Sequence, residues 1–381
     1  MGEVERVVVV GGGIGGLTVA AALRRAGVEV EVHEKFGHGP TRETGFTIWS
    51  YAIRDLIELG IDENRLDRIG SPIEASQVRN SGGKLLESMP VGEVSSKLGA
   101  PSYDCSRSDL LAALRDAAGA EALHMGSECV GIEQDSDSVT AILADGSRAT
   151  GDLLIGADGI HSVLRRAVAP KAHLNYSGFL GSGGVLEFSH DLLPRAHHIE
   201  LWSRGSKGGI ADIGGGRTRW YLITHAKPGA PGPSREALLE HVRDWWPVLY
   251  DAIAATPADA IAHSECWDLD PLPAWSDGRL VLLGDAAHAT TPFAAMGACT
   301  AIADAHELSR LLTSQPLRDA ISSYQAVRKK RGEQVIKHSR SMIRVATVYS
   351  PILAWLRDEA FEHMPADKIE AVAAGMAAGT G

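Results

Sequence analysis

Three short apolar runs stand far apart in the chain, at residues 7–10, 153–155 and 280–283, and a turn containing glycine or a glycine–aspartate pair closely follows each one. The first run consists of four consecutive valines. An unbroken β-branched run is typical of a strand buried on both faces of a parallel sheet. The pattern therefore predicts an α/β domain whose buried strands come from widely separated segments.

The first run opens a strand–turn–helix–strand unit. Residues 17–26 suit a helix with a small, apolar face, and Gly27 is placed to end it. Valines then alternate with glutamate or histidine over residues 28–33, which predicts a second strand with Glu34 at its end.

The middle of the chain differs in composition and in the spacing of its apolar residues. Over residues 176–268, glycines are frequent, tryptophans concentrate and β-type alternation dominates, which predicts an antiparallel sheet with a helix at 234–245. A hairpin is expected between about 76 and 99. Strand–loop–helix patterning returns at 280–312, and helical patterning continues beyond 315.

The α/β domain is therefore expected to be discontinuous. We expect it to comprise residues 1–75, 100–175 and 269–320, with 76–99 and 176–268 as an inserted β-rich substrate domain and 321–381 as a C-terminal helical segment.

Composition narrows the class of protein. With 381 residues, 44% hydrophobic and 22% charged, the chain suits a soluble globular protein, and its net charge of −11 argues against a nucleic-acid partner. The glycines within residues 7–23 would break a membrane helix. The four cysteines have no metal-type spacing, so we expect reduced thiols, no metal and no membrane partner in a cytoplasmic protein.

The first turn predicts a dinucleotide site. Gly11, Gly13 and Gly16 match G-x-G-x-x-G, with Gly15 in the same turn, and Glu34 follows Gly16 by 18 residues. The glycines permit a tight turn, close approach of a pyrophosphate and close packing of the helix, while the carboxylate is placed for ribose hydroxyls. The motif alone does not distinguish FAD from NAD, but the carboxylate disfavours a 2′-phosphate.

Taken together and in this order, residues 11–16, Gly-Ala-Asp-Gly at 156–159 and Gly-Asp-Ala-Ala-His at 284–288 resemble the FAD-dependent aromatic hydroxylases, the family of para-hydroxybenzoate hydroxylase. The resemblance implies a Rossmann-like FAD-binding domain of the discontinuous GR2 type, an inserted antiparallel β-sheet substrate domain and C-terminal helices.

The resemblance also assigns cofactor contacts. It implies that Gly284 and Asp285 hold the ribityl chain of FAD, and that Asp158 belongs to a segment serving FAD and the nicotinamide nucleotide. Arg107 resembles an arginine that contacts FAD near the phosphates, and Arg42 lies where members often carry a basic residue. From the residues alone, Asp158 suits an ordinary strand-to-helix turn equally well. Arg107 also suits an ordinary arginine at the start of a helix.

A loop after the last motif is expected to pass the edge of the flavin. The resemblance implies that Pro292, Gly297 and Ala298 lie there and that the following helix points its N-terminus at the flavin, where it would stabilise negative charge. The family usually has Gly-Gln-Gly before this helix and Glu-Asp within it; here Met296 replaces the glutamine and Ala303 the glutamate.

The implied activity is that of a monooxygenase. NADH or NADPH would reduce FAD, and O2 would form a flavin C4a-hydroperoxide that hydroxylates an electron-rich aromatic or polycyclic small molecule. Tyr221, His225 and His198 are candidate bases between which the sequence does not choose. Candidate substrate contacts are Tyr221, His225, Phe293 and Met296.

Other activities stay open at this stage. The same fold could serve an oxidase or an epoxidase, or less readily a halogenase, since no Trp-x-Trp-x-Ile element is present. A regulatory protein that binds FAD without catalysis is the alternative from another class. The sequence does not indicate the substrate, the choice between NADH and NADPH, or the oligomeric state.

Overall fold

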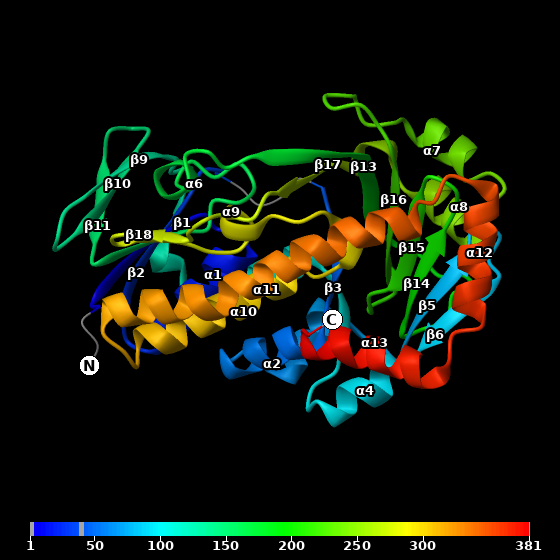
Figure 1. Ribbon diagram of the computed structural model, residues 1–381, viewed down its shortest axis with the longest axis horizontal. Helices are drawn as coiled ribbons and strands as arrows, with labels where there is room; N and C mark the ends of the chain where they lie inside the picture. Colours follow the sequence, from blue (N-terminus) through cyan, green and yellow to red (C-terminus); the bar gives the residue numbers. More distant parts are fainter. Residues whose placement is uncertain (1–3, 38–41, 381) are drawn as a thin grey trace.

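The three apolar runs of the sequence lie side by side in one sheet. In the computed structural model, which describes residues 4–37 and 42–380, they form β1 (Arg6–Val10), β12 (Leu153–Gly156) and β19 (Leu280–Leu282), paired in parallel (Figure 1). β2 (Glu29–Glu34) pairs in parallel with the other edge of β1. The predicted α/β domain with buried strands from separate segments is confirmed.

Six strands make up this main sheet, in the order β18-β19-β12-β1-β2-β8, where β8 is Leu123–Met125 and β18 is Ser276–Asp277. Helices cover one side of it and a small antiparallel sheet the other (Figure 1). The helices are α1 (Ile14–Arg25), α5 (Arg107–Ala118) and α10 (Gly297–Leu312); the small sheet is β9 (Cys129–Gln134), β10 (Val139–Leu143) and β11 (Arg148–Gly151).

A second, larger sheet is built mainly from the middle of the chain. Its order is β17-β13-β16-β15-β14-β5-β6, and its pairs are antiparallel except for the parallel pair β14–β5. The strands are β5 (Ala75–Asn80), β6 (Leu85–Met89), β13 (Leu174–Glu187), β14 (His197–Trp202), β15 (Lys207–Asp212), β16 (Arg217–His225) and β17 (Ala262–Leu269). The predicted antiparallel sheet is therefore present.

Two local predictions need correction. The expected hairpin is β5–β6, but residues after Met89 form a helix, α4 (Val91–Lys97), because Val91, Val94 and Leu98 recur at helical spacing. The single helix predicted at 234–245 is instead α7 (Arg235–His241) followed by α8 (Pro247–Ala255), since Pro247 suits the first position of a new helix.

The remaining elements connect or cover the two sheets. They are β3 (Gly45–Ile48), β4 (Gly70–Pro72) and β7 (Tyr103–Ser106) in a three-stranded sheet, the helices α2 (Ser50–Glu58), α3 (Glu63–Ile69), α6 (Arg165–Val168), α9 (Asp285–His288), α11 (Leu317–Ala346), α12 (Pro351–Glu362) and α13 (Ala366–Ala378), and short 3-10 turns at Ala120–Ala122, Ala258–Ala260 and Pro292–Ala294. No helix in the described part of the chain is both long enough and apolar enough to cross a membrane.

Strand alternation gives the larger sheet two different faces. In β16, Trp220 and Leu222 pack with α7 and α8 in a separate apolar core. Arg219, Tyr221 and Ile223 point the opposite way, because successive side chains of a strand alternate between faces. This second face is turned toward the main body and forms one wall of the candidate site.

Two long elements bridge the main body and the larger sheet. α11 has 30 residues, which corresponds to roughly 45 Å of helix, and extends alongside both regions (Figure 1). The β13–β17 pair also runs from the main body to the larger sheet and has a register shift between Tyr176 and Leu180. Arg340 of α11 ties the two together, since its Nη2 lies 2.6 Å from Asp268 of β17.

Candidate active site

A cavity of about 770 Å³ lies between the carboxyl ends of the main sheet and the inner face of the larger sheet. Its walls come from segments that are distant in sequence, including Gly13, Arg107, Asp285, Gly297 and Tyr221. Parallel strands end at the same edge of a sheet, so the turns after β1, β12 and β19 meet there. The topology thus brings the three sequence motifs to one place.

The glycines of the first turn have different roles. Gly11 has φ +111°, and a Cβ there would clash with the carbonyl oxygen of Ala157 after β12. A Cβ at Gly16 would clash with the carbonyl of Gly11, so this glycine lets α1 pack onto the turn. Gly13 is different, because a Cβ there would meet no atom within 4 Å. Gly13 and Gly15 line the cavity, and the turn presents open space at Gly13.

Glu34 lies against this turn at the end of β2. Its Oε2 accepts a hydrogen bond from the amide of Gly12 at 2.6 Å, and its Oε1 accepts one from the amide of Phe36 at 3.0 Å. The carboxylate is therefore fixed beside the glycine turn, although it does not belong to the cavity wall.

Asp285 stands at the opposite side of the cavity, at the start of α9. Gly284 before it has φ +61°, a conformation that favours glycine, and its amide donates to Asp304 Oδ2 at 3.3 Å. The Asp285 side chain is exposed and lines the cavity, and desolvation by the surrounding protein raises its pKa, although His288 and Arg107 partly oppose this. Arg107 lines the same wall from the start of α5.

The loop between α9 and α10 narrows the cavity. It contains Pro292, and Ala295 adopts a left-handed conformation with φ +49°. Trp49 Nε1 donates to the carbonyl of Ala295 at 3.0 Å, which fixes this bend. Met296 is almost fully buried yet contributes to the wall, and α10 begins at Gly297 with its first turn facing the cavity. Helix-start amides lack intrahelical acceptors, so this end favours a negative group.

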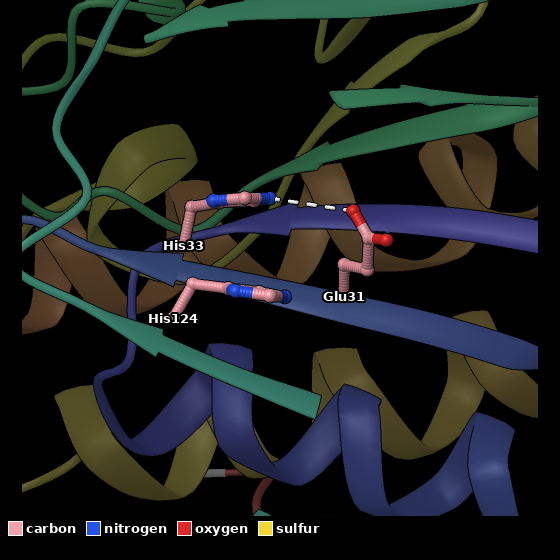
Figure 2. Close-up of side chains that lie close together, drawn as sticks. All are labelled: Glu31, His33 and His124. Atoms are coloured by element: carbon pink, nitrogen blue, oxygen red, sulfur yellow. Dashed lines mark ion pairs between the residues drawn. The ribbon is translucent and has the colours of Figure 1, made fainter. Parts of the chain in front are cut away.

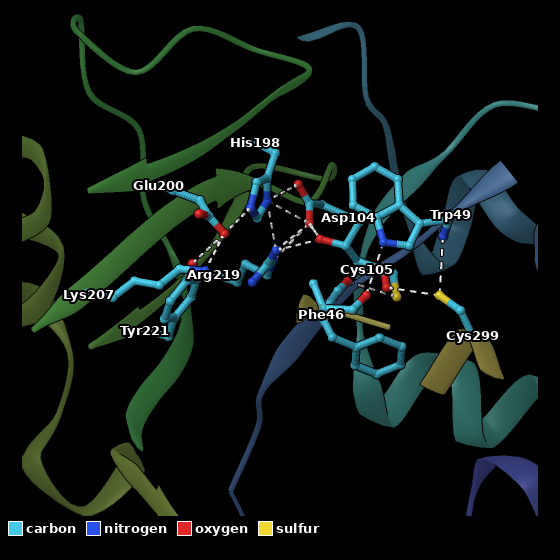
Figure 3. Close-up of polar contacts among 12 residues, drawn as sticks. Phe46, Trp49, Asp104, Cys105, His198, Glu200, Lys207, Arg219, Tyr221 and Cys299 are labelled. Carbon is cyan, nitrogen blue, oxygen red and sulfur yellow. Dashed lines mark hydrogen bonds and ion pairs between the residues drawn. The ribbon is translucent and has the colours of Figure 1, made fainter. Parts of the chain in front are cut away.

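Beyond the loop, the wall of the larger sheet carries buried charges (Figure 3). Asp104 of β7 accepts from Arg219 Nε at 3.0 Å and from Thr47 Oγ1 at 2.8 Å, and lies 3.1 Å from His198 Nδ1. Arg219 also donates to Thr47 Oγ1 at 3.0 Å. Asp104, His198 and Arg219 are each less than a tenth exposed, so this is an enclosed ionic cluster.

A second pair adjoins the first. Lys207 Nζ lies 2.6 Å from Glu200 Oε1 and 3.3 Å from the carbonyl of Phe293 in the narrowing loop (Figure 3). Tyr221 donates its hydroxyl to Glu200 at 3.3 Å, and His198 Nε2 lies 3.7 Å from the same carboxylate. We call Asp104, His198, Glu200, Lys207 and Arg219 the charged wall. His198, Glu200 and Arg219 line the cavity, and Asp104 and Lys207 pair with them without lining it. The charged wall joins the larger sheet to the loop.

The electrostatics of the charged wall favour charged over neutral forms of its acids. Burial alone would raise the pKa of Asp104, but Arg219 and His198 outweigh it and hold that pKa below its usual range. Lys207 and His198 likewise outweigh burial at Glu200 and lower its pKa. Burial would lower the pKa of His198, but Asp104 reverses the direction and raises it. Burial and the charge of Glu200 raise the pKa of Tyr221, so it stays a neutral phenol that donates rather than a base.

The cavity brings most of the predicted site residues together. Its wall includes the following predicted residues: Gly13, Gly15, Arg107, Tyr221, Gly284, Asp285, Pro292, Met296, Gly297 and Ala298. Gly11, Gly16 and Glu34 build or flank the glycine turn beside it.

Other predicted residues lie elsewhere. Asp158 Oδ2 accepts a hydrogen bond from the amide of Val163 at 2.7 Å, as in an ordinary strand-to-helix turn. Arg42 Nε donates to the carbonyl of Asp259 at 2.9 Å. His225 shares its strand face with Tyr221 but lies four residues further on, about 13 Å along the strand, and is exposed. Phe293 packs edge-on against Phe179, away from the cavity. None of these four belongs to the described cavity wall.

Four residues of the charged wall belong to no motif of the sequence, namely Asp104, Glu200, Lys207 and Arg219. The fifth, His198, is one of the candidate bases. A signal existed: His198 and Glu200 are two residues apart in a strand, as are Arg219 and Tyr221. Charged groups on one face of otherwise apolar strands indicate a lined cavity.

Comparisons with known proteins agree with this arrangement. The family model described as "FAD binding domain" matches residues 5–339. The chain is 33% identical to aurachin C monooxygenase/isomerase of Stigmatella aurantiaca, over 96% of each protein. It is 28% identical to the FAD-dependent urate hydroxylase of Mycolicibacterium vanbaalenii, over 91% of this chain and 90% of the relative. The crystal structure of Klebsiella pneumoniae HpxO with FAD and uric acid superimposes with a TM-score of 0.91 at 25% identity, over 98% of this chain and 97% of that one.

Proposed function

Because the chain belongs to the FAD-binding-domain family and is an FAD-dependent monooxygenase of the aromatic-hydroxylase type, we propose that it hydroxylates a small, planar aromatic or heteroaromatic compound that binds as an anion. The observation that carries this proposal is the charged wall at the end of the cavity beyond the Pro292 loop. NADH or NADPH is the proposed reductant.

The residues around the cavity fit FAD. Open space at Gly13 leaves room for a pyrophosphate, where an alanine-sized side chain would intrude on the ligand rather than on protein. Asp285 is exposed on the cavity wall, as suits an acceptor for sugar-type hydroxyls. The start of α10 is made of small residues and has no acidic residue in its first turn, which suits a ligand that carries negative charge.

We therefore propose positions for the cofactor contacts. Gly13 and Gly15 would hold the pyrophosphate, Glu34 the adenosine ribose, Arg107 the phosphate region and Asp285 the ribityl chain. Gly297 and Ala298 would offer backbone amides to the flavin ring, with Pro292 at its edge. When bound and reduced, flavin supplies the electrons that activate O2 for transfer of one oxygen atom.

The charged wall would orient the substrate. Arg219 and His198, whose pKa is raised by Asp104, line the cavity beside a single carboxylate, that of Glu200, so this part of the wall favours an anion over a neutral ring. Tyr221 and Met296 offer flat or apolar surface beside it. An anionic oxygen or nitrogen makes an aromatic ring more electron-rich, which favours attack by electrophilic oxygen.

The relatives support this class of substrate. One of them acts on urate, and the HpxO structure contains uric acid, a heteroaromatic compound with acidic N–H groups. Another relative is named for aurachin C. A polyene hydrocarbon would offer no polar group to the charged wall, so we favour ring hydroxylation over epoxidation of an alkene.

The test is a substrate screen with paired compounds. Purified flavoprotein is given NADH or NADPH and a panel of ionisable heteroaromatics, each beside its neutral O- or N-methyl derivative. We expect the ionisable member to stimulate coenzyme consumption, and its product to carry one atom from ¹⁸O2. Stimulation by the methylated members alone would contradict the anion proposal. Hydrogen peroxide without labelled product from every compound would favour an oxidase.

A single variant tests the wall itself. His198→Gln removes an imidazole that lines the cavity, while Asp104 keeps its pair with Arg219 and Glu200 keeps its pair with Lys207. We expect KM for the ionisable substrate to rise at least about tenfold, with flavin absorbance unchanged. Lys171→Gln, at an exposed lysine outside the cavity wall, is the control and should leave KM unchanged. An unchanged KM in His198→Gln would remove His198 from substrate binding.

A further inference from the structure

A cluster of two histidines and one glutamate lies on the main sheet, apart from the cavity (Figure 2). Glu31 and His33 are two residues apart on β2, so their side chains share one face of the sheet. His124 is the direct cross-strand partner of His33, in the parallel pair β2–β8. Strand register alone therefore gathers three potential metal ligands.

The distances within the cluster suit one small cation. Glu31 Oε2 lies 3.6 Å from His33 Nε2, and the rings of His33 and His124 stack with centroids 4.8 Å apart and planes 12° from parallel. One ligand atom from each residue lies within 4.8 Å of the other two. Two ligand atoms about 2.1 Å from a tetrahedral metal are about 3.4 Å apart. Imidazole binds a metal in its ring plane, so the ring of His124, now stacked on that of His33, must turn about its side-chain torsions to reach the same ion.

Each of the two β2 ligands is already oriented by a second hydrogen bond. His33 Nδ1 lies 2.9 Å from Ser127 Oγ, which can accept its proton and leave Nε2 with a free lone pair. His33 is 95% buried, and this Nε2 has no hydrogen-bond partner among the described residues. Arg6 Nη2 donates to Glu31 Oε1 at 2.6 Å, so Oε2 is the oxygen turned toward His33. A buried lone pair without a donor is an unfavourable feature that a metal ion would remove.

We propose that Glu31, His33 and His124 bind one divalent transition-metal ion of the zinc class. Imidazole and carboxylate ligands suit Zn²⁺, Ni²⁺ or Cu²⁺, and hard cations such as Mg²⁺ would prefer an all-oxygen site. Three protein ligands leave a fourth position for water. His124 is exposed and Glu31 is partly exposed, so the ion can enter from solvent.

Another group in the described part of the chain has suitable spacing, namely Glu359, Glu362 and His363 near the end of α12. It has one histidine, Glu362 already pairs with Lys84 at 2.6 Å, and Glu362 and His363 are exposed to solvent. It therefore serves as an internal comparison for the cluster on β2 and β8.

The experiment is calorimetric titration of the FAD-bound, metal-free protein with ZnCl2 alone. We expect one ion per chain, and His124→Ala should weaken binding at least about tenfold. Because His124 is exposed on a short edge strand, its removal should leave the fold intact, as thermal unfolding would show. His363→Ala is the matched control and should bind as the unchanged protein does. Failure of the unchanged protein to bind Zn²⁺, or equal binding by His124→Ala, would overturn the proposal.

Copper gives a second readout that does not depend on activity. With one Cu²⁺ per chain, the electron paramagnetic resonance spectrum should show coupling to two imidazole nitrogens, and His124→Ala should reduce this to one. Glu31→Gln should retain both couplings but weaken binding. Flavin absorbance should not change on addition of Zn²⁺, because none of the three residues lines the cavity. Two-nitrogen coupling that survives in His124→Ala would place the ion elsewhere.

Discussion

Gly11 and Gly13 differ in what surrounds them, although they lie two residues apart in the same turn. Gly11 needs its positive φ and has the Ala157 carbonyl directly against it, whereas Gly13 faces open space. The sequence motif marks both positions alike. The structure separates Gly11, which the fold requires, from Gly13, where a Cβ would meet no protein atom within 4 Å.

This difference predicts opposite behaviour for two variants. Gly13→Val should give a folded protein that loses most of its FAD affinity, because the added side chain occupies cavity space. Gly11→Ala should lower the free energy of unfolding of the FAD-free protein by about 1–3 kcal/mol, through strain and a backbone clash. Urea unfolding without FAD and fluorescence titration with FAD measure the two effects. Retained FAD affinity in Gly13→Val would contradict the proposed pyrophosphate position.

Glu87 of β6 is a residue whose environment opposes its charge. It is 7% exposed, its Oε1 has no hydrogen-bond partner among the described residues, and burial together with the charge of Glu200 raises its pKa to about 7. An unfolded glutamate titrates near about 4.3, so the native state holds an extra proton between these two values. Stability therefore falls as pH rises from about 4 to 7 and stays reduced above that.

Glu87→Gln should remove this dependence. At pH 8 the variant should be more stable than the unchanged protein by about 1–2 kcal/mol, and near pH 4.5 the difference should disappear. Urea midpoints at the two pH values give the comparison. Glu128→Gln, at an exposed position, should shift neither value. A constant difference at both pH values would mean that ionisation of Glu87 is not its cause.

At the scale of elements, α10 is fixed to its neighbours by one buried carboxylate. Asp304 pairs with Arg328 Nε of α11 at 2.7 Å, with His288 Nε2 of α9, and with the amide of Gly284. Burial would raise its pKa, but His288 and Arg328 outweigh it and lower it. One side chain thus positions the Gly284–Asp285 turn and the start of α10 relative to each other.

Asp304→Asn should therefore be strongly destabilising. It leaves the nearly buried Arg328 without its charge partner, which typically costs about 3–5 kcal/mol. Glu307→Gln, which breaks an exposed pair with Arg310 on the same helix, should cost less than about 1 kcal/mol. Urea unfolding measures both. Similar decreases in the free energy of unfolding of the two variants would contradict a special stabilising role for the Asp304–Arg328 pair.

Elements differed in how well the sequence predicted them. The valine run of β1 and the glycine turn have local signatures, so the main sheet was predictable. The helix boundaries near Pro247 and Val91 were not, because short apolar segments suit either structure until tertiary packing decides. The charged wall and the His33–His124 pair arise from strand register between distant segments, which a single sequence does not display.

For the whole molecule, the cavity depends on segments separated by hundreds of residues. If one FAD contacts the glycine turn, Arg107 and the Asp285 loop together, removing it should raise hydrogen exchange in all three segments at once. Adding FAD at 100 times its dissociation constant should stabilise the protein by about 2.7 kcal/mol. Slower exchange at the glycine turn alone would contradict a shared ligand.

The bridge formed by α11 and the β13–β17 pair affects how substrate enters the cavity and how product leaves it. Two adjacent elements that both bridge the main body and the larger sheet, joined by the ion pair of Arg340 and Asp268, resist opening of the molecule about a hinge. We therefore expect reactants to enter and leave through movement of short surface loops rather than of whole domains, with loop opening limiting turnover.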